Sequence, residues 1–105
     1  MDVTHVLEGY LFVWDSEKAE TNRQKHGVSF EQACQVFLDD FYKMYPEIHE
    51  KEERWIIMGH SYLAHPIKPL YVVAVEKGED TWRIISVRFA SPAERRRYEE
   101  EDDTD

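Results

Sequence analysis

Cysteine is almost absent, because Cys34 is the one thiol among 105 residues. A lone thiol cannot form an intramolecular disulfide, so the chain does not fit the class of small disulfide-stabilised secreted domains. We therefore expect a reducing, cytoplasmic location. Cys34 falls among the apolar positions of a predicted helix, and we interpret it as a small buried core residue rather than a reactive thiol.

Long apolar runs are also missing. No stretch approaches the ~20 residues that cross a bilayer, and residues 1–5 lack the basic segment that opens a signal peptide. The sequence therefore predicts no association with a membrane. The composition, with 42% hydrophobic and 33% charged residues, is typical of one globular domain whose core needs neither disulfides nor metal.

Positive charge is scarce, since 13 basic residues face 22 acidic ones and the net charge is −9. Taken alone, this balance argues against a nucleic-acid partner. However, residues 99–105 hold six acids and no base, so the remainder carries only −3, and the basic run Arg95-Arg96-Arg97 precedes this tail. A terminal acidic run is typical of a solvated tail. The alternative is a mimic that competes with RNA for a basic surface.

The hydrophobic pattern predicts eight elements in the order β-α-α-β-β-β-β-α. Strands are expected at residues 12–14, 41–45, 54–59, 70–75 and 82–90, and helices at residues 16–26, 30–37 and from 92 onward. Pro46 is expected to stop the second strand, and residues 60–69 form a loop. This order indicates an α+β fold with helices on a mostly antiparallel sheet of four to five strands. Residues 1–11 are interpreted as an N-terminal extension, 12–98 as the folded domain and 99–105 as an acidic tail.

The predicted helices carry recognisable caps. Asp15 is a suitable N-cap and Gly27 a suitable left-handed C-terminal residue for the first helix. Ser29 with Gln32 forms a capping-box pattern before the second helix, and Ser91 with Glu94 does so before the third.

The first of these helices has an unusual composition, because Ala19 is its only apolar residue. A helix that is polar all round has little hydrophobic reason to dock. Helical spacing places Ala19, Asn22 and His26 on one stripe, so we expect this side to be hydrogen-bonded inward and the outer side to be free for a ligand. The alternative is a solvated surface helix.

The last strand alternates between two kinds of residue. We expect Ile85, Val87 and Phe89 to pack under the helices, because successive side chains of a strand point to opposite faces. That leaves Ser86 and Arg88 on the second face, where a groove is expected.

Several short motifs, in order along the chain, resemble the BrnT family of type II toxin–antitoxin toxins. The first part comprises Phe-Val-Trp-Asp at residues 12–15, Lys-Ala at 18–19, Asn at 22 and Lys-His-Gly-Val-Ser-Phe-Glu at 25–31. The second comprises Glu-Arg-Trp at 53–55, Gly at 59, Arg-Ile-Ile-Ser-Val-Arg at 83–88, Glu-Arg at 94–95 and Tyr at 98. The resemblance covers residues 12–98, whereas the extension, the 60–66 loop and the acidic tail depart from the pattern.

This resemblance implies a RelE-like fold and a ribonuclease that inhibits translation. It also implies a BrnA-like antitoxin that forms a hetero-oligomer with the toxin and contacts DNA, so that the toxin itself meets DNA only indirectly. No cofactor is implied.

The chemistry expected of such an enzyme is RNA cleavage without metal, in which the ribose 2′-hydroxyl attacks the adjacent phosphorus. Histidine suits the proton transfers because its pKa lies near neutrality, and arginine suits the phosphate because its planar fork is always charged. Six residues are therefore candidates for catalysis: Lys25, His26, His49, Arg54, Arg88 and Tyr98. Lys18, Arg83 and Arg95 are candidate RNA contacts.

Each candidate catalytic residue is expected to have a particular role. His49 or His26 would transfer the proton with Lys25 in support, Arg54 and Arg88 would hold the phosphate, and Tyr98 would stack or donate a hydrogen bond. Each has an ordinary alternative. Arg54 and Glu53 would form only a surface ion pair, His26 would be a helix-terminal cation, and Tyr98 would be a core residue.

Other functions remain open at this stage. A degenerate toxin would pair with a DNA-binding partner without cleaving RNA. The two helices around Gly27 resemble a helix-turn-helix, but the second is acidic where a DNA-reading helix should not be. A metal site is not predicted, because His49, Glu53, His60 and His65 lack the spacing of a known zinc motif.

Overall fold

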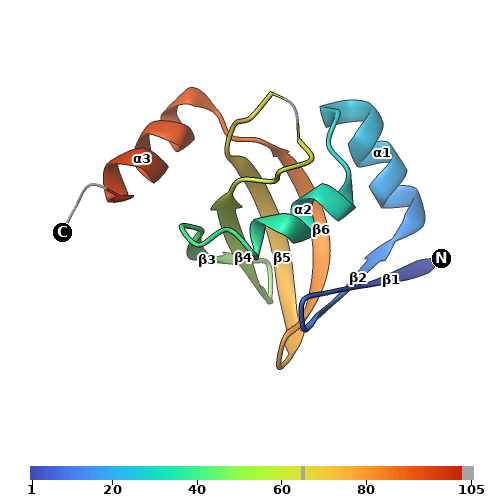
Figure 1. The fold of residues 1–105 in the computed structure, drawn as a ribbon. Coiled ribbons are helices and arrows are strands. Elements are labelled where there is room, and N and C mark those ends of the chain that lie inside the picture. Colours follow the sequence, from blue (N-terminus) through green and yellow to red (C-terminus); the bar gives the residue numbers. More distant parts are fainter. Residues whose placement is uncertain (65, 103–105) are drawn as a thin grey trace.

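The computed structural model describes residues 1–64 and 66–102 and has the element order β-β-α-α-β-β-β-β-α (Figure 1). The strands are β1 (Asp2–Leu7), β2 (Tyr10–Asp15), β3 (Lys43–His49), β4 (Glu52–Gly59), β5 (Leu70–Gly78) and β6 (Thr81–Phe89). The helices are α1 (Ser16–His26), α2 (Phe30–Val36) and α3 (Pro92–Asp102). The predicted α+β class is confirmed.

In the described part of the chain the strands form one six-stranded sheet in the order β1-β2-β6-β5-β4-β3. All neighbours are antiparallel except β2 and β6. The predicted count of four to five strands was therefore wrong. The missed strand is β1, which pairs with β2 along its whole length through a turn in which Glu8 and Gly9 have positive φ angles. Its exposed, alternating side chains give a weak strand pattern, and only pairing with β2 makes it a strand.

Helix α1 docks through the hydrogen bonds of one side chain rather than through an apolar face. The buried Asn22 amide donates to Val87 O at 2.8 Å and to Val28 O at 3.3 Å, and its oxygen accepts from Val87 N at 3.1 Å. Because β2 pairs with β6 only up to Arg83, the backbone of β6 at Val87 lacks a strand on that side. Asn22 supplies the missing partners, which explains why a helix with one apolar residue packs here.

Helix α2 supplies the apolar layer over the sheet, lying across its strands in Figure 1. The Ser29–Gln32 capping box is present as predicted, and the buried residues Phe30, Ala33 and Cys34 face the core. Cys34 is fully buried, and desolvation raises the pKa of its thiol above the ordinary value. The interpretation of Cys34 as a core residue is confirmed.

Pro46 does not end a strand, contrary to prediction. Strand β3 continues through it to His49 and pairs with β4 in register, with Pro46 opposite Trp55. Proline is tolerated because β3 is an edge strand, whose outward amide needs no partner. The turn to β4 is correspondingly short, and Glu50 adopts a positive φ of 55° there.

A bulge in β6 changes which residues face the core. Val73 pairs with Ser86 and Ala74 with Ile84, so Ile85 is an extra residue. Val87 is buried and Phe89 packs against the core as predicted, but Ile84 rather than Ile85 is buried on that side. The strict alternation expected for this strand was therefore wrong before residue 86.

The sheet has one face covered by α1 and α2 and one face free of both helices, which we call the open face. Register places Tyr45, Ile56, Val73 and Ser86 in one row across this face, and Lys43, Met58, Tyr71 and Arg88 in the next. Helix α3 follows β6 and projects from the side of the sheet opposite to α1 (Figure 1). None of the described helices is long and apolar enough to cross a membrane.

Candidate functional site

A groove of about 470 Å³ lies between α1 and β6. Lys18, Lys25 and His26 line it from the helix, and Ile85 and Ser86 line it from the strand. Lys18, Asn22 and Lys25 fall on one side of α1 by helical spacing, so fixing Asn22 against β6 aims both lysines along this groove. Three of the predicted site residues are thus brought together.

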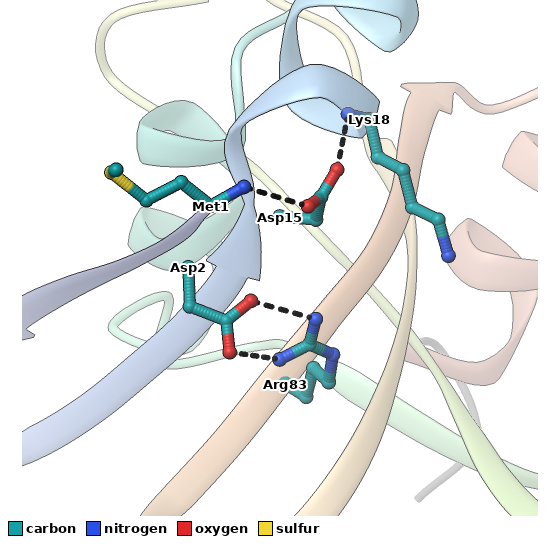
Figure 2. Close-up of polar contacts among 5 residues, drawn as sticks. All are labelled: Met1, Asp2, Asp15, Lys18 and Arg83. Atoms are coloured by element: carbon teal, nitrogen blue, oxygen red, sulfur yellow. Dashed lines mark hydrogen bonds and ion pairs between the residues drawn. The ribbon is translucent and has the colours of Figure 1, made fainter.

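The cations of this groove are not neutralised by ion pairs within residues 1–64 and 66–102. No salt bridge in that part of the chain involves the side chains of Lys18, Lys25 or His26. Figure 2 shows the Lys18 side chain running past the end of α1 toward β6, while its backbone amide donates to the N-cap carboxylate of Asp15 at 3.0 Å. Asp15 and Glu17 also border the groove and limit its positive charge.

The open face carries the three predicted arginines Arg54, Arg83 and Arg88. In the register of the sheet, Arg88 and Arg83 of β6 lie opposite Tyr71 and Val75 of β5. Arg54 of β4 lies opposite Glu47 of β3. Ser86 belongs to both the groove and this face, and Arg88 follows it at about 7 Å along the strand. Arg54 and Arg88 are separated by two strand spacings and lie on the order of 15 Å apart between Cα atoms, which is too far for both to contact one phosphate.

Arg88 is held in place by three neighbours. Its Nη1 and Nη2 donate to the Glu94 carboxylate at 2.7 and 2.9 Å, and Nη1 also donates to Phe89 O at 3.2 Å. The guanidinium lies over the Tyr71 ring, 4.1 Å from its centroid. The hydrogen bonds from Arg88 hold the pKa of Glu94 at about 2.

The other predicted arginines also meet carboxylates. Arg83 donates to both oxygens of Asp2 at 3.1 and 3.3 Å (Figure 2), and this contact lowers the pKa of Asp2. Arg54 pairs with Glu52 at 3.1 Å rather than with its neighbour Glu53, and exposed Arg95 pairs with Glu99 at 2.7 Å.

Tyr98 lies in a different part of the molecule from the groove. It is buried, its hydroxyl donates to Asp39 Oδ2 at 3.4 Å, and its ring meets the His60 ring edge-on. His60 Nδ1 also contacts Asp39 Oδ2 at 3.3 Å. Burial acts to raise the pKa of Asp39, but hydrogen bonds from the Phe41 and His60 amides and the His60 ring lower it overall.

Sequence reasoning missed this carboxylate–imidazole pair, which borders an apolar cavity of about 340 Å³ beside Tyr62 and Ile67. Asp39 and His60 are 21 residues apart, and no local pattern links them. His60 had been considered only as a metal ligand. Among the described residues no group of three metal-ligating side chains is present.

Three features named in the sequence analysis fall where placement is not fully described. His49 lies in β3 opposite Glu52, and only its backbone position is described. His65 and residues 103–105 lie outside the described residues.

The groove and the open face together can bind a polyanion. Lysines without a salt bridge in the described part of the chain and an imidazole lie at one end, and guanidinium groups with neighbouring aromatic rings continue across β6 and β5. Lysine, arginine and aromatic side chains side by side suit single-stranded nucleic acid, whose phosphates and bases need both kinds of contact.

Comparison with known proteins gives a consistent result. Residues 14–94 match the family described as the ribonuclease toxin BrnT of type II toxin–antitoxin systems. The crystal structure of the Brucella abortus ribonuclease toxin BrnT is similar, with 28% identity, a TM-score of 0.58, and 74% of this chain and 92% of that chain covered. A comparison with curated proteins found no match. Because the matched segment covers most of the sequence, the chain belongs to the BrnT family of ribonuclease toxins of type II toxin–antitoxin systems.

Proposed function

We propose that this toxin cleaves RNA without metal, at the groove between α1 and β6, by attack of a ribose 2′-hydroxyl on the adjacent phosphorus. The observation that carries the proposal is the group of Lys18, Lys25 and His26, which face Ser86 without a salt bridge in the described part of the chain. RNA supplies its own nucleophile, so the protein needs only proton transfer and charge stabilisation.

The roles follow from side-chain chemistry. His26 transfers the proton, Lys25 stabilises the charge that develops on the phosphorane, and Lys18 contacts a neighbouring phosphate. Arg88 and Arg54 on the open face bind further phosphates of the same strand. His49, the alternative proton-transfer group, is left out of this centre because β5 and β4 separate its strand β3 from β6 in the sheet. Arg83 and Arg95 remain weaker RNA contacts. We leave Tyr98 out of this centre because it is buried against Asp39 and His60.

The proposal is tested by incubating purified protein with single-stranded RNA in the presence of a chelator such as EDTA. We expect cleavage that the chelator leaves unchanged and that yields 2′,3′-cyclic phosphate ends. His26→Gln and Lys25→Ala should each lower the cleavage rate about 10²-fold or more, because one group that acts in proton transfer or charge stabilisation typically contributes that much.

The matched control is Lys77→Ala. This lysine lies near the β5–β6 turn, at the end of the sheet far from the C-terminus of α1 (Figure 1). Its replacement by alanine changes the net charge by the same amount as Lys25→Ala. It should leave the rate unchanged. Equal losses in Lys25→Ala and Lys77→Ala, or loss of activity with chelator, would contradict the proposed centre.

We further propose that the toxin inhibits translation in the cytoplasm and forms a hetero-oligomer with a BrnA-like, DNA-binding antitoxin. The family's place in type II toxin–antitoxin systems supports this pairing. Growth arrest on expression, relieved by coexpression of the neighbouring reading frame, is the expected outcome. Arrest that this frame does not relieve would refute the pairing.

A catalytically inactive binding module is the second candidate. It is favoured by the carboxylates that engage Arg54, Arg83 and Arg88 on the open face. Such a module would bind the antitoxin while the wild-type protein cleaves no RNA, so the cleavage assay separates the two functions.

A further inference from the structure

Three donors converge on the carboxylate of Glu94 at the junction of β6 and α3. Arg88 Nη1 and Nη2 donate to its two oxygens at 2.7 and 2.9 Å, and the Ser91 amide donates to Oε1 at 2.8 Å. A guanidinium fork accommodates a phosphate in the same two-bond geometry as a carboxylate. The junction therefore has the donor set of an anion site, filled by a side chain of the protein itself.

Arg88 has contacts at this junction that do not depend on Glu94. Arg88 stacks on Tyr71 at 4.1 Å and donates to Phe89 O at 3.2 Å, and neither contact involves the carboxylate. The side chains of Arg88 and Glu94 are 37% and 27% exposed, so solvent reaches the pair. Rotation of the Glu94 side chain alone would expose the guanidinium, while Tyr98 remains buried and keeps α3 attached to the fold.

The junction also lies next to the proposed cleavage groove. Arg88 is two residues beyond Ser86, which lines that groove, and a strand advances about 7 Å over two residues. This spacing is close to that of neighbouring phosphates in an extended single strand. An RNA chain held at Lys25 and Ser86 would thus carry its next phosphate toward Arg88.

We propose that the Arg88–Ser91 junction is a phosphodiester subsite of the RNA surface and that Glu94 is its internal occupant, which an RNA phosphate must displace. The inference rests on the proposed function, since it takes the open face as the RNA surface. Glu94 thereby lowers RNA affinity in the free toxin and selects for ligands that offer a phosphate at this position.

The test uses a fluorescent single-stranded 2′-O-methyl RNA, which lacks the nucleophilic hydroxyl and reports binding alone by fluorescence anisotropy. Glu94→Gln removes the charge but keeps a side chain that satisfies the capping box with Ser91. We expect this variant to bind the RNA several-fold more tightly than the wild type. The control is Glu100→Gln, which makes the same change of charge at an exposed position of α3.

A double-mutant cycle identifies the cause of the gain. If Glu94 competes for Arg88, the gain from Glu94→Gln should disappear in an Arg88→Gln background, whereas a general charge effect would persist there. Glu94→Asp provides a second variant, because it keeps the charge while shortening the reach by one methylene. It should also bind RNA more tightly than the wild type.

The proposal is overturned if Glu94→Gln gains no more affinity than Glu100→Gln, if its gain survives in the Arg88→Gln background, or if Glu94→Asp binds like the wild type. These results leave the proposed function intact when Lys25→Ala still lowers the rate at which unmodified RNA is cleaved. If the wild-type toxin and Lys25→Ala cleave that RNA equally fast, the proposed function itself fails.

Discussion

At the scale of single residues, Asn22 determines how the most polar helix attaches to the sheet. Its amide makes three hydrogen bonds to buried backbone groups of Val28 and Val87. A helix with this composition would otherwise remain in solvent. The groove beside Lys25 and His26 therefore depends on one side chain that takes no direct part in the proposed chemistry.

Asn22→Ala should destabilise the fold strongly. The substitution leaves a backbone amide and two carbonyls buried without partners, and each such group costs about 1–3 kcal/mol. After partial relaxation we expect a loss of about 2–4 kcal/mol in the free energy of unfolding, measured by urea denaturation. Gln24→Ala is the control, because among the described residues Gln24 bonds only to exposed Glu20; a similar loss in both variants would contradict this account.

The Glu94 carboxylate should make the free energy of unfolding depend on pH in the acidic range. Its folded pKa of about 2 lies below the ordinary value of 4.5, with the hydrogen bonds from Arg88 as the largest cause. Its contribution is therefore complete above about pH 4.5 and is lost as the pH falls toward 2. The difference in unfolding free energy between wild type and Glu94→Gln should narrow over this range in urea titrations. A difference that stays constant down to about pH 2 would show that the ion pair does not stabilise the fold.

At the scale of elements, close contact between α2 and β4 sets the position of the Asp39–His60 pair. Gly59 ends β4, and a Cβ atom there would lie 2.9 Å from Val36 Cγ1 and 3.0 Å from Asp39 Oδ2. The absence of a side chain thus lets the end of α2 and the following turn approach the sheet. This approach brings Asp39 to the His60 amide and ring.

Gly59→Ala should therefore destabilise the fold by about 1–3 kcal/mol through overpacking. The matched control is Gly78→Ala, where the added Cβ would meet only Thr81 Cβ at 3.9 Å. Thermal unfolding of the two variants gives the comparison. Equal melting temperatures would mean that the α2–β4 contact tolerates a methyl group.

At the scale of the whole molecule, the net negative charge repels RNA, whereas the cations gathered in the groove attract it. The net charge is −9, yet Lys18, Lys25 and His26 gather in one groove. Long-range repulsion of RNA acts on the approach of the two molecules, whereas the local cations act once contact is made. Acidic residues at the C-terminus would thus affect association more than dissociation.

Replacing Asp102, Asp103 and Asp105 by asparagine tests this separation, because it removes three negative charges of the acidic terminus. At low ionic strength the variant should associate with RNA faster than the wild type in stopped-flow fluorescence. The difference should disappear near 0.15 M salt, where the Debye length is about 8 Å. An acceleration that persists at this salt concentration would instead indicate direct competition between the tail and RNA for the same groups.

Local signals in the sequence predicted much of the fold and part of the site. Asp15, Gly27 and the capping boxes at Ser29 and Ser91 act through neighbours within one helical turn, so the helix ends could be read directly. The placement of Ser86 and Arg88 on one face of the last strand was also predicted. The division into residues 1–11, 12–98 and 99–105 remains a prediction.

What the sequence by itself determined is the set of helices, the apolar strands and the residue types able to bind phosphate, since these depend on short-range periodicity. Tertiary structure alone decided the pairing of β1, the bulge at Ile85, and the neighbours of each charged group. Arg83 meets Asp2, Asp39 meets His60 and Arg88 stacks on Tyr71 only after segments distant in sequence have come together. The energy of such contacts depends on distance in space, which no local pattern of residues encodes.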